Sequence, residues 1–364
     1  SSLRTVPLNT IHQTLQAKMV PFAGYSMPVQ YTEGILQEHL HTRQQAGLFD
    51  VSHMGAILVQ GPQAALALEM LIPADIQEMS PGQVKYGLLL NQHGGIIDDL
   101  LISRLAEGFL LVVNADGKEN DLNLINDNIS SKARVTPLFD RAMLALQGPK
   151  AACVLGRFFP EISSLAFMSA LTTSFEGTSV FISRTGYTGE DGFELILESS
   201  FAQQFFQELL NQPEVKPIGL GARDSLRLEA GLCLYGHDII QVTTPVMAGL
   251  TWAIGKRRRL EGGFPGADII LSEITTGVKQ KRIGFIPQTK AIAREGCTIH
   301  TNEGQIVGKI TSGTHSPSLG IPIAMGYLDA DQLNTTDLTV NIRNHLYPVK
   351  VAKLPFVPHN YYRG

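Results

Sequence analysis

Paired cysteines, long apolar runs and a strong excess of either charge are all missing from this sequence of 364 residues. The three cysteines lie far apart and form no CxxC motif, so the sequence indicates neither a disulfide framework nor a zinc site. This use of cysteine is typical of a protein in a reducing compartment. No apolar run reaches the roughly 18 residues that a membrane-spanning helix needs. The first residues also lack the apolar core of a secretory signal. We therefore expect neither secretion nor contact with a membrane.

The charge balance and the absent motifs exclude further classes of protein. A formal net charge of −4 offers no basic excess for the phosphates of a nucleic acid. The sequence has no GxGxxG after an N-terminal strand, no GxSxG elbow and no phosphate loop ending in GK[ST]. What is present is 44% hydrophobic residues in a chain long enough for two to three domains, so we expect sizeable cores.

The order of helix-like and strand-like segments suggests how these domains are arranged. Residues 34–48 favour a helix and residues 51–60 a strand, and a strand at 142–147 restarts the pattern. Segments 58–71 and 144–158 both read as a strand that ends in Gln-Gly-Pro before an Ala-rich helix. This indicates either a distant internal repeat or the same local chemistry used twice. After about residue 280, short strands alternate with turns, which predicts a small all-β domain.

The stretch SRTGYTGEDGFELIL, residues 183–197, has glycines at strict three-residue spacing around Tyr187. Strand-forming residues flank it on both sides, so we expect a hairpin with a Gly-rich loop. Such a loop is either an ordinary turn or a place where backbone closely approaches a ligand. Glu194 lies at the start of the second strand, whereas Glu190 and Asp191 have no evident role and are expected to be solvated.

Other polar candidates are ambiguous one by one. Asp98 and Asp99 follow a turn, and only one of them can face a given pocket because adjacent strand residues point to opposite sides. Arg223 and Arg227 share a helical face, which is typical of a salt-bridged helix as well as of a binding site. The basic run at residues 255–259 is either solvated surface or a contact for an acidic partner.

Taken together, seven motifs stand in a specific order along the whole chain: FDVSHM (49–54), GGIIDDL (94–100), RTGYTGEDGFE (184–194), GARDSLRLEAGLCLYG (221–236), GKRRR (255–259), TSGTHSPSLG (311–320) and PFVPHNYY (355–362). In this the sequence resembles the aminomethyltransferases of the glycine cleavage system, the T-protein family. The resemblance extends from near residue 10 to residue 362.

The resemblance implies an α+β fold of three domains, arranged as a cloverleaf around a central folate channel, with a small all-β C-terminal domain. We expect a discontinuous first domain of residues 1–50 plus 141–275, a second of 51–140, and a C-terminal β-barrel of 276–364. The implied reaction moves an aminomethyl group from the lipoyl arm of H-protein to tetrahydrofolate, without a metal. Its products are 5,10-methylenetetrahydrofolate, ammonia and dihydrolipoyl H-protein.

The resemblance also implies roles for individual residues. Asp99 matches the essential aspartate, which would stabilise positive charge on the transferred carbon. Glu194 matches the glutamate that accepts two hydrogen bonds from the pterin edge, and Arg223 matches an arginine that pairs with a folate carboxylate or with Glu194 itself. The remaining expected contacts of the folate are Tyr86, Tyr187, Tyr361, Met54 and Trp252.

The implied protein partner is acidic, so a basic face beside the channel is expected. Its candidates are Lys256, Arg257, Arg258, Arg259 and Arg294. Two rival functions stay open: a folate-binding relative in iron–sulfur assembly, whose KGCYxGQE-type motif is replaced here by GLCLYGHD around Cys233, and a non-catalytic folate-binding module. A related oxidase would need a flavin domain for which no spare length exists. We expect a cytoplasmic protein, with the mitochondrial matrix as the alternative.

Overall fold

A computed structural model describes residues 2–364, and its first sheet is built from two distant parts of the chain. The six strands follow the order β10-β11-β12-β9-β3-β13. They are β3 (Ala46–Asp50), β9 (Ala142–Gln147), β10 (Ala170–Phe175), β11 (Thr178–Ser183), β12 (Gly192–Leu197) and β13 (Val215–Ile218). All six residues of β9 are buried, and this apolar run places β9 inside the sheet rather than at an edge.

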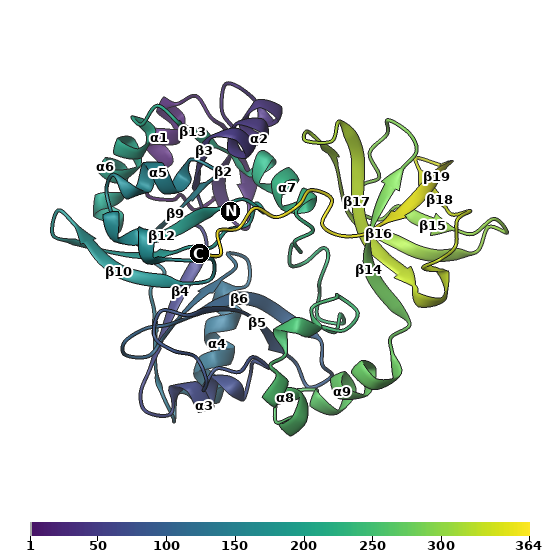
Figure 1. Ribbon diagram of the computed structural model, residues 1–364, viewed down its shortest axis with the longest axis horizontal. Helices are drawn as coiled ribbons and strands as arrows, with labels where there is room; N and C mark the ends of the chain where they lie inside the picture. Colours follow the sequence, from purple (N-terminus) through teal and green to yellow (C-terminus); the bar gives the residue numbers. More distant parts are fainter. Residues whose placement is uncertain (1) are drawn as a thin grey trace.

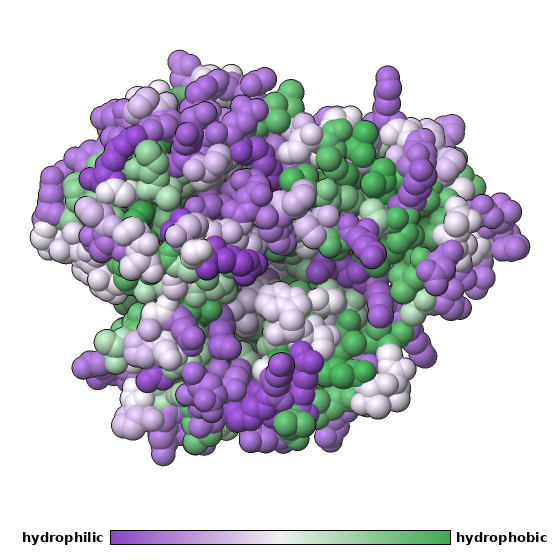
Figure 2. Space-filling view, in the orientation of Figure 1, coloured by the Kyte–Doolittle hydropathy of each residue, from purple (hydrophilic) through white to green (hydrophobic). Residues whose placement is uncertain are grey.

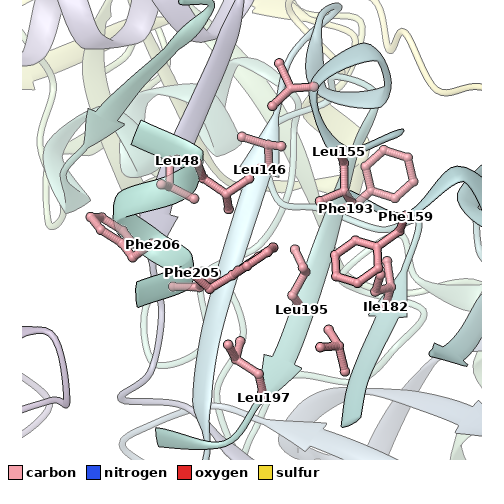
Figure 3. Close-up of a cluster of buried hydrophobic side chains, with 14 of the residues drawn as sticks. Leu48, Leu146, Leu155, Phe159, Ile182, Phe193, Leu195, Leu197, Phe205 and Phe206 are labelled. Carbon is pink, nitrogen blue, oxygen red and sulfur yellow. The ribbon is translucent and has the colours of Figure 1, made fainter. Parts of the chain in front are cut away.

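Helices cover this sheet and complete its core. They are α1 (Asn9–Thr14), α2 (Ile35–Gln44), α5 (Ala151–Gly156) and α6 (Ser199–Leu210). The buried positions of α6 recur at helical spacing, so one face carries Phe201, Phe205, Phe206 and Leu209. Figure 3 shows Phe205 pointing from α6 toward the leucines of the sheet strands, and Phe206 belongs to the same buried cluster. A separate two-stranded sheet pairs β1 (Lys18–Phe22) with β2 (Tyr25–Gln30).

The expected helix at residues 34–48 is wrong at its end. The helix stops at Gln44, and residues 46–50 form β3, which pairs with β9 and β13. A short apolar run is compatible with helix or strand, and here the tertiary pairing decides. Gly47 must be small because a Cβ there would lie 2.5 Å from the Thr42 hydroxyl. The strand expected from residue 51 also starts later, at Gly55.

The second sheet is antiparallel throughout, in the order β5-β6-β7-β4-β8. Its strands are β4 (Gly55–Gln60), β5 (Val84–Leu90), β6 (Ile96–Arg104), β7 (Phe109–Val113) and β8 (Arg134–Pro137), with α3 (Ala64–Glu69) and α4 (Lys118–Ile129). Gly61 after β4 and Gly148 after β9 have the same φ of 130°. The two Gln-Gly-Pro segments therefore share a local conformation.

The chain then passes through α7 (Leu220–Glu229), α8 (Lys256–Glu261) and α9 (Ala267–Thr276) into a closed barrel. The barrel strands are β14 (Gln280–Pro287), β15 (Thr298–His300), β16 (Ile306–Ser316), β17 (Ile321–Asp329), β18 (Thr339–Ile342) and β19 (His345–Ala352). The expected all-β C-terminal domain is thus confirmed. Short 3-10 turns, Pro160–Ser164, Thr251–Ala253 and Ala330–Gln332, occur between elements.

The three lobes surround a common centre, and the segment after β19 returns from the barrel to the first lobe (Figure 1). The surface is hollowed where the lobes meet (Figure 2). This is the expected three-lobed α+β architecture. Domain boundaries at residues 50, 140 and 275 stay a proposal, which is supported by the membership of β3 and β9 in one sheet.

Candidate active site

Asp99 and Tyr86 are brought together by the register of β5 and β6. Asp99 pairs with Leu88 and Tyr86 pairs with Leu101, so the two side chains are diagonal neighbours on one face of the sheet. The Tyr86 hydroxyl donates to Asp99 Oδ2 at 2.8 Å. Asn114, just after β7, donates from Nδ2 to Asp99 Oδ1 at 2.7 Å. Asn114 was missed in the sequence because a single asparagine after a strand carries no motif.

The pKa of the Asp99 carboxyl is raised to about 6, chiefly by burial and then by the neighbouring charge of Asp98, against the hydrogen bonds from Tyr86 and Asn114. The pKa of the Tyr86 hydroxyl is also raised, chiefly by burial and then by the charge of Asp99. Tyr86 therefore stays a hydrogen-bond donor, and Asp99 is mostly ionised at neutral pH. An anion held in a partly enclosed site is suited to stabilise a nearby cation.

A narrow pocket lies between β6 and β12 and contains two of the expected residues, Met54 and Glu194. Its walls are mainly apolar, formed by Leu101, Val112, Met143, Phe181 and Ile196. The Thr185 hydroxyl donates to Glu194 Oε1 at 2.6 Å and fixes the carboxylate. The cavity itself is only about 20 Å³, so what the structure shows here is an oriented carboxylate among apolar side chains.

Arg223 on α7 lies with its guanidinium 4.9 Å from the ring centre of Tyr187. Its Nη1 atom is buried and has no hydrogen-bond partner among residues 2–364. Burial lowers the pKa of Arg223, and the charge of Glu194 opposes that shift. An unpaired buried N–H is costly, so it is a ready donor for a ligand oxygen. The structure shows no hydrogen bond between Arg223 and Glu194 among the described residues.

The Gly-rich stretch forms the expected hairpin between β11 and β12, and two of its glycines make room for a buried side chain. Any Cβ at Gly186 or Gly192 would collide with the side chain of Gln147. The Gln147 amide donates to the Thr185 carbonyl at 3.0 Å and accepts from the Thr188 hydroxyl at 2.8 Å. The loop therefore closes on a buried glutamine.

Tyr187 and the two acids of the loop are also held by protein groups. The Tyr187 hydroxyl donates to the Cys233 carbonyl at 2.5 Å. Glu190 pairs with Arg43 at 3.0 Å, and Asp191 accepts from Arg184 at 2.8 Å. The expectation that these two acids are solvated is wrong: Glu190 pairs with Arg43 from the distant helix α2, and Asp191 pairs with Arg184 of the same hairpin.

Trp252 and Tyr361 lie at different places around the centre. Trp252 is 63% exposed and its ring centre lies 5.3 Å from that of Tyr86. Trp252 also lines a cavity of about 220 Å³ together with Lys281 and Arg282. Tyr361, by contrast, stacks on Phe167 at 3.8 Å in the returning C-terminal segment. Trp252 is thus joined to the Asp99 site, whereas Tyr361 packs with the first lobe.

Most side chains of the basic run at residues 255–259 bind groups within the protein. Arg257 forms ion pairs with Glu69 at 2.6 Å and with Asp75 at 2.7 Å. Arg258 is 3% exposed and donates to the carbonyls of Ile72, Ala74, Glu69 and Gly263. Arg259 donates to the carbonyls of Ile254 and Thr251. The contacts of Arg257 and Arg258 fix α8 to the second lobe, and only Lys256 and Arg294 of the expected basic face are exposed.

Cys233 is buried, and burial raises the pKa of its thiol to about 12, so the reactive thiolate is disfavoured. Residues 2–364 contain no group of three potential metal ligands. Among the described helices, none has the length and apolarity required to cross a bilayer.

The fold and site together define an α+β protein whose three lobes meet beside a partly enclosed acid and an apolar pocket. Two family models match the chain: the GCVT N-terminal domain over residues 8–258, and the glycine cleavage T-protein C-terminal barrel domain over residues 280–358. The chain therefore belongs to the glycine cleavage T-protein family, which confirms the resemblance seen in the motifs.

Similar proteins extend over nearly the full chain. The mitochondrial aminomethyltransferase of Gallus gallus is 44% identical and that of Dictyostelium discoideum 42%, each aligned over 99% of this chain and 94% of the relative. The crystal structure of the glycine cleavage system aminomethyltransferase T from Bartonella henselae matches with a TM-score of 0.95 at 42% identity, covering 99% of this chain and all of that one.

Proposed function

We propose that this chain is a tetrahydrofolate-dependent aminomethyltransferase of glycine cleavage. It takes the aminomethyl group from the lipoyl arm of H-protein, forms 5,10-methylenetetrahydrofolate, and releases ammonia and dihydrolipoyl H-protein. The observation that carries the proposal is Asp99, held by Tyr86 and Asn114 at 2.8 Å and 2.7 Å, in a chain that matches the family from end to end.

Asp99 is the proposed catalytic residue. When the aminomethyl carbon leaves sulfur or nitrogen, positive charge develops on it, and an ionised carboxylate within a partly enclosed site stabilises that charge. Tyr86 and Asn114 hold both Asp99 oxygens, so the charge does not need to reorient during the reaction.

The pocket with Glu194 and Met54 is the proposed pterin site. The Glu194 carboxylate accepts from the ring N–H and the amino group, and the apolar walls cover the ring faces. The unpaired Nη1 of Arg223 donates to a folate oxygen, which satisfies a buried group that the protein leaves open. Tetrahydrofolate supplies the two amines that accept the one-carbon unit.

Partner docking is proposed at the exposed basic groups. Lys256 and Arg294 stay candidates, and the exposed Lys281 joins them because it lines the cavity beside Trp252. The three arginines at 257–259 are a weaker proposal because of their internal contacts. Tyr361 stays a proposed folate contact without a supporting contact to the Asp99 site.

The surroundings of Cys233 and Asp99 argue against the two rival functions. A role in iron–sulfur assembly calls for a reactive motif cysteine, whereas the pKa of Cys233 is raised to about 12 by burial. A folate-binding module without catalysis has no need of an anion held at both oxygens beside the pocket.

For the location in the cell, several relatives are named mitochondrial, which fits the matrix alternative, and the cytoplasmic assignment has no such support.

One assay tests the whole proposal. Purified protein is mixed with aminomethyl-loaded H-protein and tetrahydrofolate, and methylenetetrahydrofolate and ammonia are measured together. The expected result is equal amounts of both products, with neither formed when H-protein lacks the lipoyl group. Folate binding without product would support the non-catalytic module instead.

A further inference from the structure

Two buried carboxyl groups, Asp98 and Asp121, lie behind Asp99 and have no role in the proposed reaction. Asp98 precedes Asp99 on β6, and Asp121 is in the first turn of α4. Each residue is only 1% exposed. Asp98 Oδ2 and Asp121 Oδ2 share one small space beside Gly117, because both lie within 3.5 Å of the position that a Cβ on Gly117 would take. This is an acid pair directly adjacent to the proposed catalytic aspartate.

The hydrogen bonds of this pair are unequal. Asp98 Oδ1 accepts from the Asp99 backbone N–H at 2.9 Å and from Asn114 Nδ2 at 2.7 Å. Asp98 Oδ2 and both Asp121 oxygens have no donor among residues 2–364. Two buried carboxylates in contact cannot both ionise, so one proton must lie between them. Asp98 accepts two hydrogen bonds, which favour its ionised form and assign the proton to Asp121.

The neighbouring backbone is shaped to admit the pair. A Cβ on Gly117 would lie 2.7 Å from Asp98 Oδ2 and 3.5 Å from Asp121 Oδ2. The φ of Gly117 is −93°, which any residue adopts, so the lack of a side chain serves close approach and not backbone strain. A glycine at this position leaves room for two carboxyl groups to meet.

We propose that Asp121 is a positioning residue for Asp99. Asp121 donates its proton to Asp98 Oδ2, and the Asp98 carboxylate then holds the Asn114 amide. The Asn114 side-chain amide donates to Asp98 Oδ1 and to Asp99 Oδ1, both at 2.7 Å. By holding Asn114, the acid pair therefore fixes the orientation of the Asp99 carboxylate. The proposal rests on the proposed function, because it gives Asp99 the central role.

The charges around the pair support this arrangement. Burial raises the pKa of both Asp98 and Asp121, and the charge of Asp98 in turn raises the pKa of Asp99. Asp116 and Tyr235 are two further titratable groups that interact with the pair, and neither supplies a positive charge. The pKa of Asp99 therefore depends on which member of the pair is ionised.

The first test detects the proton without measuring activity. Infrared spectra of the parent, Asp121→Asn and Asp127→Asn are compared at pH 8, where Asp99 is ionised because its pKa is about 6. We expect a protonated-carboxyl band in the parent that shifts in deuterated water, disappears in Asp121→Asn and persists in Asp127→Asn. Asp127 is an exposed acid of the same helix and serves as the matched control. A band that survives Asp121→Asn overturns the shared proton.

The second test asks whether the pair acts on Asp99. Asparagine at 121 can still donate to Asp98, so Asp121→Asn should keep the acid limb of the kcat–pH profile where the parent has it. Leucine cannot donate, so in Asp121→Leu the buried Asp98 takes up the proton itself and loses its charge. The acid limb should then move about one pH unit lower, with kcat reduced roughly tenfold.

The two tests fail separately. Identical acid limbs in the parent, Asp121→Asn and Asp121→Leu would overturn the positioning role, since a purely structural acid changes kcat or stability without moving the limb. The infrared result stands even if the chain shows no aminomethyl transfer, in which case the proposed function fails and the acid pair does not. If Asp121→Leu fails to fold, Asp121→Asn still decides the question of the proton.

Discussion

Replacing Asp99 by asparagine should make the protein more stable and far less active. Asparagine has nearly the same size, its oxygen can still accept from Asn114, and its amide N–H can donate to the Tyr86 hydroxyl oxygen, so the pocket keeps its shape. Only the charge is lost. Removing a charge that stabilises a developing cation typically costs about 3 kcal/mol, which corresponds to a decrease of roughly 100-fold or more in kcat.

The gain in stability follows from the pKa of Asp99, which burial and Asp98 raise from 3.8 to about 6. A raised pKa means that the folded state disfavours the ionised carboxylate, by about 2–3 kcal/mol at pH 7. Below pH 3.8 the group is neutral in both states and the parent loses nothing. As the pH rises to about 6 the unfolded chain ionises first, so the parent loses stability that the asparagine variant keeps.

Two measurements check this. Chemical unfolding of the parent and the Asp99→Asn variant should give equal stability near pH 3.5 and a growing advantage for the variant up to about pH 6, with Asp127→Asn resembling the parent throughout. Turnover is followed as methylenetetrahydrofolate formation from aminomethyl-loaded H-protein. Near-parental turnover in Asp99→Asn would refute its catalytic role, and a stability difference independent of pH would refute the raised pKa.

Three further predictions concern the pocket, the lobe contacts and the basic face. Glu194→Ala should weaken tetrahydrofolate binding by about 1.5–3 kcal/mol in calorimetric titration, with the unfolding midpoint little changed; equal affinity would remove Glu194 from the site. Burial acts to raise the pKa of Glu229, but hydrogen bonds from His39, Ser316 and Ser318 have the larger effect, so the net pKa is lowered to about 2. Its contribution to stability should be present above about pH 4.5 and fade as the pH falls toward 2, so Glu229→Gln should flatten the stability–pH curve there. Lys256→Ser combined with Arg294→Ser should raise the KM for H-protein and reduce its salt dependence, whereas Arg257→Ser should mainly lower stability by breaking three ion pairs; the reverse pattern would restore the arginine run as the docking face.

The sequence predicted local features wherever the signal was local. The hairpin around Tyr187, the all-β C-terminal segment and the Gln-Gly-Pro turns each depend on residues close together in the chain, and the structure contains all three. Even there, the sequence did not predict that two of the glycines pack against a buried side chain. Gly186 and Gly192 are small because of Gln147, a residue about forty positions earlier whose approach no local pattern encodes.

The seven motifs by themselves determined the family, the three-lobed architecture and the candidate Asp99, because they can be read from the sequence in their order along the chain. Only the tertiary structure decided what surrounds them. Strand register placed Tyr86 beside Asp99, and the turn after β7 added Asn114. Folding also turned the apparent basic face at Arg257 and Arg258 into internal ion pairs and carbonyl contacts with the second lobe. Sequence records which charges exist, whereas their energies depend on partners and burial, and those are set by segments that meet only when the chain folds.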